Sequence, residues 1–273
     1  MNAVVNQIID SISGTVPRSE NEYKGKDGLL HCLICHRAVE VEVEALGKKK
    51  KVRCICDCRK KELDARLERD RIDEIERQRK VCFIESNMHK WTFENDDRQN
   101  AKLSDAMKNY VENFREFKKE GTGLLLYGTV GIGKTYYAAC IANSLIDKGV
   151  SVLMTNFISL ANQLFNAKDK QLFVENLNKY SLLIIDDLGA ERKSEFMQEQ
   201  VWNIIDSLYR SGLPFIVTTN LTAEELKKSN DITYSRIYDR ILERCFPVEV
   251  AGASRRRQNL RDSFGDTKSR LGL

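Results

Sequence analysis

The sequence predicts an α/β protein in which helices flank a parallel sheet, preceded by a small module rich in cysteine. Apolar runs at 124–126, 182–185 and 215–217 each end in glycine or polar residues, as buried parallel strands do. Stretches with helical periodicity separate these runs, which is typical of strands joined by crossover helices. Cysteines crowd into residues 32–58 and predict a separate small module at the front of the chain.

The composition is that of an ordinary soluble globular protein, with 42% hydrophobic and 31% charged residues among 273. This length suffices for one substantial core and a small accessory module. A net charge of +4 does not by itself indicate a nucleic-acid partner. No apolar run approaches the length of a membrane span, and the N-terminus lacks the layout of a signal peptide. We therefore expect a cytoplasmic protein without membrane contact, whose cysteines bind metal or stay as buried thiols.

Residues 1 to 28 suggest a short helix followed by a loop, and the cysteine-rich segment comes next. A Cys-x-x-Cys pair precedes a strand that alternates Val and Glu, a turn made by Gly47 and a lysine run, and three returning cysteines. Four of the five cysteines could hold a structural Zn²⁺ ion, and the pattern leaves open which two of the last three take part. His31 or His36 could replace one of them. The five are Cys32, Cys35, Cys54, Cys56 and Cys58.

A charged segment at 59–80 links this module to the rest of the chain. Opposite charges three or four residues apart and apolar residues at helical spacing predict a single solvated helix that acts as a spacer. Residues 95–97 then offer N-caps for a core helix that ends before Gly121. We therefore expect a zinc-binding interaction module at 1–58, a helical linker at 59–95 and an α/β domain at 96–273.

The segment from Gly128 to Thr135 matches the phosphate-binding pattern of four residues between a glycine and Gly-Lys-Thr. It follows an apolar strand and opens a helix expected from Lys134 to Asp147, which is the setting that this pattern needs. Glycines let backbone N–H groups converge on phosphates, Lys134 would reach the outer phosphates, and the Thr135 hydroxyl would hold Mg²⁺. The expected nucleotide-binding residues are Gly128, Thr129, Val130, Gly131, Ile132, Gly133, Lys134, Thr135 and Tyr136.

Two aspartates follow the second apolar run, at the edge where open parallel sheets bind their ligands. Asp186 would join Thr135 in holding Mg²⁺, and Asp187 would orient and deprotonate the water that attacks the γ-phosphate. Asn220 ends the third run and could bond that water or the phosphate, or else cap the following helix. The other expected elements are a strand at 150–155, helices at 156–166, 170–179, 194–209 and from 232 onward, and a last strand at 246–250.

The order of these motifs resembles the DnaC/DnaI type of bacterial and phage replicative helicase loader, which is related to the IstB transposition ATPases within the AAA+ superfamily. The resemblance extends over the C-terminal part of the chain, and the cysteine-rich front resembles the zinc-bearing, helicase-binding module of such loaders. The motifs that carry it are the phosphate loop at 128–135, LLIIDDLG at 182–189, IVTTN at 216–220, SRIYDRI at 235–241 and GASRRR at 252–257.

The resemblance implies a P-loop AAA+ sheet of the ASCE type, with the phosphate-loop strand flanked by the acidic and polar strands. It implies that Asn220 senses the γ-phosphate, that Arg236 is a finger reaching the ATP of a neighbouring subunit, and that Arg256 is a second sensor. Arg240 fits the pattern closely enough to remain an alternative finger. Asp187 is shorter than the glutamate common in AAA+ proteins, which we interpret as allowing slow, switch-like hydrolysis.

The leading hypothesis is an ATP-switched loader that uses ATP, Mg²⁺ and Zn²⁺. Its zinc module would grip a hexameric replicative helicase, its ATPase domains would self-associate, and single-stranded DNA would be held while the ring is placed on it. Lys168, Lys170 and residues 255–257 are weak basic candidates for DNA contact.

Two alternatives remain. One is an IstB-like transposition accessory ATPase that binds duplex DNA, although such proteins generally lack a zinc module. The other is a zinc-stabilised adaptor whose nucleotide site does not turn over. Direct reading of DNA by the cysteine module is disfavoured, because the module lacks the helix-borne histidine pair of a DNA-reading zinc finger.

Overall fold

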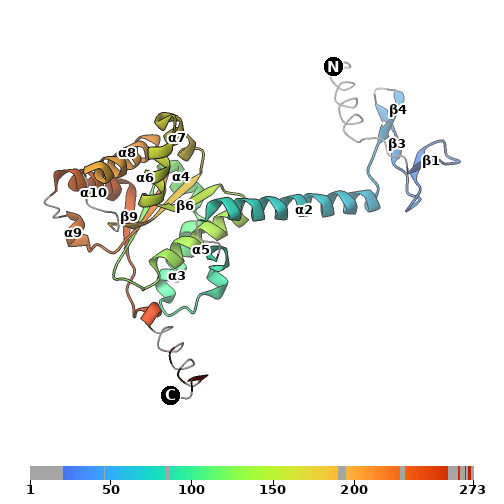
Figure 1. The fold of residues 1–273 in the computed structure, drawn as a ribbon. Helices are drawn as coiled ribbons and strands as arrows, with labels where there is room; N and C mark the ends of the chain where they lie inside the picture. Colours follow the sequence, from blue (N-terminus) through green and yellow to red (C-terminus); the bar gives the residue numbers. More distant parts are fainter. Residues whose placement is uncertain are drawn as a thin grey trace. The chain divides into compact units, whose positions relative to one another are not determined.

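The computed structural model (Figure 1) describes residues 21–45, 47–83, 87–189, 195–227 and 231–257, with Phe264, Lys268, Arg270 and Leu271. The chain divides into two compact units, Met1–Glu74 and Ile75–Leu273, and the boundary falls within helix α2 (Asp57–Cys82). The short helix expected near the N-terminus lies outside the described residues. Within the described ranges, every helix is too short or too polar to span a membrane.

The described part of the first unit contains two antiparallel hairpins and the start of α2. Strand β1 (Glu22–Lys24) pairs with β2 (Leu30–Cys32), and β3 (Glu40–Ala45) pairs with β4 (Lys48–Arg53). The prediction that the lysine run forms a turn was wrong, because these lysines belong to β4. Two of them lie opposite glutamates of β3, in the pairs Glu42 with Lys51 and Glu44 with Lys49. Opposite charges at facing positions stabilise a hairpin, so the sequence favours pairing here over a turn.

Helix α2 covers the charged segment expected at 59–80, and two short 3-10 turns follow it, η1 (Met88–Lys90) and η2 (Phe93–Asn95). The single core helix expected before Gly121 is instead two helices, α3 (Ala101–Glu112) and α4 (Phe114–Glu120), which meet at Asn113. The N-cap of α3 is Asn100, whose side chain accepts a hydrogen bond from the Leu103 N–H. The predicted cap at 95–97 was wrong because Asp97 instead accepts hydrogen bonds from Gln99 and Arg255.

The second unit is built on a parallel sheet of five strands, which confirms the predicted α/β class. Four of the five strands are mostly apolar and buried, whereas the edge strand Cys245–Glu249 is mostly exposed. The strand order is β6-β7-β8-β5-β9. The phosphate-loop strand β5 therefore lies between the polar strand β8 and β9. The resemblance had implied that the acidic strand β7 flanks β5, and that expectation was wrong because β8 lies between them. The strands are β5 (Gly123–Tyr127), β6 (Val152–Asn156), β7 (Leu182–Leu188), β8 (Phe215–Thr219) and β9 (Cys245–Glu249).

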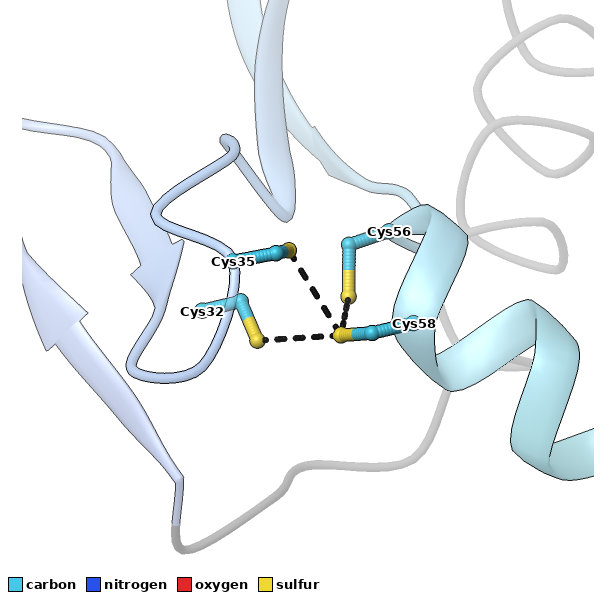
Figure 2. Close-up of side chains that lie close together, drawn as sticks. All are labelled: Cys32, Cys35, Cys56 and Cys58. Atoms are coloured by element: carbon cyan, nitrogen blue, oxygen red, sulfur yellow. Dashed lines mark hydrogen bonds between the residues drawn. The ribbon is translucent and has the colours of Figure 1, made fainter.

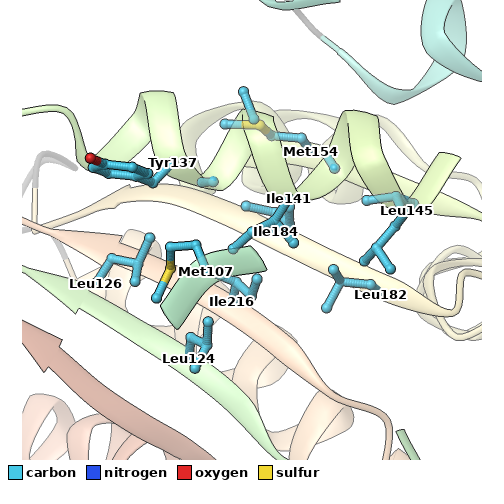
Figure 3. Close-up of a cluster of buried hydrophobic side chains, with 14 of the residues drawn as sticks. Met107, Leu124, Leu126, Tyr137, Ile141, Leu145, Met154, Leu182, Ile184 and Ile216 are labelled. Atoms are coloured by element: carbon cyan, nitrogen blue, oxygen red, sulfur yellow. The ribbon is translucent and has the colours of Figure 1, made fainter. Parts of the chain in front are cut away.

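Helices cover both faces of this sheet, because alternate residues of each strand point to opposite sides. Leu124 and Leu126 of β5 pack with α3 and α5 in one core, which Figure 3 shows, and Leu125 packs with α6, α8 and α10 in the other. Burial of one such leucine contributes about 2 kcal/mol. The helices are α5 (Lys134–Asp147), α6 (Phe157–Asn166), α7 (Lys170–Leu177), α8 (Glu195–Ser211), α9 (Ala223–Lys227) and α10 (Ile232–Arg244).

Candidate functional site

The loop between β5 and α5 needs glycine at three positions. Gly128, Gly131 and Gly133 have φ values of 143°, 82° and 105°, in the region that residues with a side chain rarely adopt. A Cβ atom at Gly128 would lie 2.4 Å from the Val250 carbonyl oxygen, and one at Gly131 would lie 2.5 Å from the Ser254 hydroxyl. The loop is therefore folded tightly against the segment that follows β9.

Lys134 begins helix α5 and is 6% exposed. Its ammonium donates to the carbonyl oxygens of Gly128 at 2.9 Å and Thr129 at 2.7 Å, and to Asn220 Oδ1 at 2.7 Å. Burial lowers the pKa of Lys134, while the charges of Asp187 and Asp186 act to raise it. All three ammonium hydrogens are used within the chain, so a phosphate group would have to replace some of these contacts in order to bind Lys134.

Asp186 ends the apolar part of β7 and faces the start of α5. Its Oδ1 atom accepts hydrogen bonds from Thr135 Oγ1 at 3.0 Å and Thr218 Oγ1 at 2.6 Å. Burial raises the pKa of Asp186, and the bonds from Thr218 and Thr135 oppose that shift. A hydroxyl and a carboxylate in contact are the hard oxygen ligands that Mg²⁺ takes from a protein when substrate phosphates and waters supply the rest. The residues present therefore fit a magnesium ion.

Asp187 lies beside Asn220, whose Nδ2 atom donates to its Oδ1 atom at 2.8 Å. Because the other end of the same amide accepts from Lys134, Asn220 joins the candidate base to the candidate phosphate-binding lysine. The sequence left open whether Asn220 caps the next helix. The hydroxyl of Thr222 performs that role, since it accepts from the Glu225 N–H at 3.2 Å.

The basic segment after β9 is divided between two environments. Arg255 donates to Asp97 Oδ1 at 2.7 Å, and its backbone N–H donates to the Gly131 carbonyl at 3.0 Å. Arg256 is exposed beside the phosphate loop, and its charge adds to the lowering of the Lys134 pKa that burial mainly causes. The predicted second sensor therefore lies near the loop, whereas Arg255 is committed to an ion pair and is poorly suited to contact DNA.

The two candidate finger arginines of α10 differ in their surroundings. Arg240 pairs with Asp206, and its guanidinium lies 3.8 Å from the centre of the Trp202 ring. Arg236 is exposed at a cleft of ≈ 440 Å³, where Trp202 and Thr233 also lie. Within the described part of the chain, no hydrogen bond or ion pair holds its guanidinium. Arg236 is therefore available to reach a neighbouring molecule, and Arg240 is not.

Four cysteines of the first unit converge, as Figure 2 shows. The Sγ atoms of Cys32, Cys35, Cys56 and Cys58 all lie within 4.8 Å of one another, with 3.1 Å between Cys56 and Cys58. Four thiolates around Zn²⁺ at about 2.3 Å would be about 3.8 Å apart, so the cluster fits a closed structural zinc site. Cys54 does not join it, because its thiol points to the Ala38 carbonyl oxygen at 3.5 Å.

Neither histidine joins the cluster. His31 Nε2 contacts both carboxylate oxygens of Asp27, at 2.9 and 3.0 Å, and its Nδ1 contacts the backbone oxygen of His36 at 3.1 Å. The His36 ring contacts the Tyr23 hydroxyl at 3.3 Å. In the described part of the chain, the candidate zinc ligands are therefore four cysteine sulfur atoms, and neither histidine replaces one of them.

Two site residues behave in ways that sequence reasoning did not reveal. Tyr136 was expected among the nucleotide-binding residues, but its hydroxyl donates to the Thr92 carbonyl at 2.8 Å and its ring packs beside Trp91. Thr218 was not singled out, although it contacts both aspartates through one hydroxyl. The available signal was a pair of threonines, Thr218 and Thr219, at the end of an otherwise apolar strand.

The comparisons with known proteins agree with this geometry. A family model described as IstB-like ATP binding protein matches residues 57–263. The replicative helicase loader DnaI of Bacillus subtilis (strain 168) is 29% identical over 167 residues, which cover 56% of this chain and 52% of that protein. The replicative helicase loader DnaC of Escherichia coli (strain K12) is 29% identical over 142 residues, which cover 49% of this chain and 54% of that protein.

A solved structure supports the same relationship. The crystal structure of DnaI aligns with a TM-score of 0.55 and 27% identity, covering 66% of this chain and 99% of that chain. The resemblance inferred from the motifs is therefore confirmed. The chain matches about half the length of the loaders DnaI and DnaC.

Proposed function

Since this chain belongs to the family of IstB-like ATP-binding proteins, we propose that it is an ATP-switched loader that places a ring-shaped replicative helicase on single-stranded DNA. The observation that carries the proposal is its similarity to the helicase loaders DnaI and DnaC through the half of the chain that contains the phosphate loop. The four-cysteine cluster in front of that half supports a separate recognition module. The protein would act in the cytoplasm, where replication takes place.

ATP would bind at the loop between β5 and α5. Lys134 would exchange its contacts with the Gly128 and Thr129 carbonyl oxygens for phosphate oxygens. A bound Mg²⁺ ion neutralises charge on the β- and γ-phosphates, and Thr135 and Asp186 would hold it. Turning Lys134 toward a phosphate would also release the Oδ1 atom of Asn220, the residue whose Nδ2 atom binds Asp187.

Hydrolysis would need groups from two subunits. Asp187 would orient the attacking water and take its proton, and Asn220 would hold either that water or the γ-phosphate. Arg256 would contact the phosphates of its own subunit. Arg236, which no described residue holds, would neutralise charge on the phosphoryl group bound to a neighbouring copy. ATP turnover would therefore depend on self-association.

The cysteine cluster would hold a structural Zn²⁺ ion and stiffen the module that grips the helicase. Apolar side chains stand exposed between its cysteines, with Leu33 at 48%, Ile34 at 69% and Ile55 at 43% exposure. Exposed apolar side chains gathered on a small module are typical of a protein interaction surface. The proposed helicase contact would use these side chains.

Single-stranded DNA would contact the second unit. Phe165 of α6 and Phe196 of α8 are 64% and 45% exposed, and their rings meet edge to face at 5.6 Å. Exposed aromatic rings beside lysines can stack on unpaired bases without sequence preference, and Lys168 and Lys170 lie close by in the chain. We propose this aromatic pair as the base-contacting part of the DNA surface.

The test is complex formation with the replicative helicase of the same cell. The full-length chain and the helicase are mixed with ATP and Mg²⁺, with ADP, or without nucleotide, and are analysed by sizing chromatography. A loader co-elutes with the helicase and alters its loading on a single-stranded circle in an ATP-dependent way. Absence of a complex under all three conditions would refute the proposal. An excess of affinity for duplex over single-stranded DNA would favour a transposition accessory ATPase instead.

Two substitutions separate a switch from an adaptor that does not hydrolyse ATP. Lys134→Ala removes the candidate phosphate contact, and Asp187→Ala removes the candidate base. A loader loses phosphate release and loading with either change. An adaptor keeps its helicase contact and its activity with both, and it shows no phosphate release in the unmodified protein.

A further inference from the structure

The end of strand β7 contains a β-bulge that faces a single threonine. In the parallel ladder Ile185 pairs with Val217, and the next pair is Leu188 with Thr219. Two residues of β7, the aspartates 186 and 187, therefore lie opposite one residue of β8, which is Thr218. A bulge of this kind redirects side chains and is common beside functional sites. Here it turns successive carboxylates toward different partners, Asp186 to Thr135 and Asp187 to Asn220.

One hydroxyl connects both members of this bulge. Thr218 Oγ1 donates to Asp186 Oδ1 at 2.6 Å and accepts a hydrogen bond from the Asp187 backbone N–H at 2.9 Å. The side chain is 1% exposed, so water does not replace either bond. The extra residue in a bulge disrupts the regular ladder locally, and the threonine side chain supplies the acceptor that the Asp187 N–H lacks there.

The backbone at this point is held in an uncommon conformation. Asp187 has a φ of 62°, one of three positive values found at residues other than glycine in the described ranges. Such a conformation persists where surrounding contacts hold it. The hydrogen bond from the Asp187 N–H to Thr218 is a contact at the strained residue itself, and Asn220 binds the carboxylate of the same residue through its amide.

We propose that Thr218 is a positioning residue that sets the two carboxylates of the bulge, Asp186 for the metal and Asp187 for the attacking water. The proposal rests on the ATPase function proposed above, but its geometric part concerns the free protein. Thr218 is not itself a candidate ligand, because its hydroxyl proton is given to Asp186 and it accepts from Asp187. Thr135 also bonds Asp186, but its hydroxyl is the one expected to turn to the metal, which leaves Thr218 as the lasting donor.

The experiment compares three variants in the full chain. Thr218→Val keeps the shape of the side chain and removes the hydroxyl, and Thr218→Ser keeps the hydroxyl. Thr155→Val is the matched control, because Thr155 is a buried threonine of β6, which pairs with β7 on the side away from β8, and its hydroxyl has no hydrogen-bond partner in the described structure. Thermal unfolding of each variant establishes that it is folded before the other measurements.

The first measurement is backbone hydrogen exchange of the peptide that covers residues 185–188, without nucleotide. An amide that loses its only buried acceptor should exchange about tenfold faster or more in Thr218→Val, and close to normally in Thr218→Ser and Thr155→Val. Unchanged exchange in Thr218→Val would overturn the proposal, because the hydroxyl would then not hold the bulge. This readout does not depend on whether the protein hydrolyses ATP.

The second measurement is the Mg²⁺ concentration that gives half-maximal phosphate release from ATP. Loss of a group that orients a metal ligand typically weakens metal affinity tenfold to a hundredfold, so Thr218→Val should need about tenfold more Mg²⁺ or more, with rescue by serine. Equal Mg²⁺ requirements in Thr218→Val and the unmodified protein would overturn the positioning role. If the unmodified protein releases no phosphate, the proposed function fails, and the exchange comparison still decides whether Thr218 sets the bulge.

Discussion

Two single substitutions on helix α10 should have different effects: loss of Arg240 should lower stability, and loss of Arg236 should lower the rate of ATP hydrolysis. Arg240 lies over the Trp202 ring at 3.8 Å and pairs with Asp206, the two charged side chains being 23% and 18% exposed. A partly buried cation on an aromatic ring contributes about 1 kcal/mol, and a partly screened ion pair contributes about 1 kcal/mol more. Asp206 keeps a second partner, Arg210, at 2.9 Å, so no uncompensated charge is left.

Arg240→Ala should therefore destabilise the second unit by about 2 kcal/mol, which lowers the melting temperature by about 4–8 °C for a unit of this size. Arg236 is exposed and no described residue holds it, so Arg236→Ala should change stability by less than about 0.5 kcal/mol. If Arg236 is the finger, its loss should reduce the rate of phosphate release about a thousandfold. Arg240→Ala should retain most of that rate at a temperature where it is folded.

The assay is phosphate release with melting curves measured on the same samples. Mixing Arg236→Ala with Lys134→Ala tests action between subunits, because the first has an intact nucleotide site and the second has an intact finger. Partial recovery of turnover in the mixture is expected, and Arg210→Ala serves as a control for the loss of an exposed arginine nearby. The reasoning is refuted if the mixture stays inactive, or if Arg240→Ala loses turnover without losing stability.

Three further predictions follow from the same geometry. Cys56→Ser should abolish binding of one Zn²⁺ per chain and unfold the first unit while ATP binding persists, whereas Cys54→Ser should keep the metal. Metal analysis and circular dichroism measure both effects, and loss of the metal in Cys54→Ser but not in Cys56→Ser would contradict the assignment. Asp186→Asn should stabilise the nucleotide-free protein, because burial raises the pKa of Asp186 and the ionised form is disfavoured in the folded state. The stability gain of Asp186→Asn should be absent below pH 3.8, the pKa of Asp186 in the unfolded chain, and should grow as the pH rises through the raised pKa of the folded state. A stability gain that stays constant from pH 3 upward in melting experiments would contradict this. Phe165→Ala and Phe196→Ala should each weaken single-stranded DNA binding about tenfold at fixed salt in fluorescence anisotropy, and unchanged affinity would remove the aromatic pair from the DNA surface.

The candidate nucleotide site could be predicted largely from local sequence. Gly128 to Thr135 specifies its own loop, because only glycine reaches the backbone angles and the close approaches found there. The apolar runs likewise predict buried strands, since continuous hydrophobicity has few other stable outcomes in a soluble chain. The position of the aspartates at the carboxyl edge follows from parallel pairing alone. These features depend on neighbours in the sequence, so they can be read without knowing the fold.

Other features depend on residues far apart in the chain, and only the tertiary structure decided them. Strand order put β8 between the phosphate-loop strand and the acidic strand, which no local pattern encodes. The choice of Cys56 over Cys54 followed from where each thiol points once the hairpins pack. The position of Thr218 opposite both aspartates depends on a bulge, which arises from the pairing of two strands. Arg240 differs from Arg236 because its guanidinium packs on Trp202, an aromatic residue of another helix. Each of these features is a contact between segments that are far apart in the sequence, so it is determined only when those segments pack together in the fold.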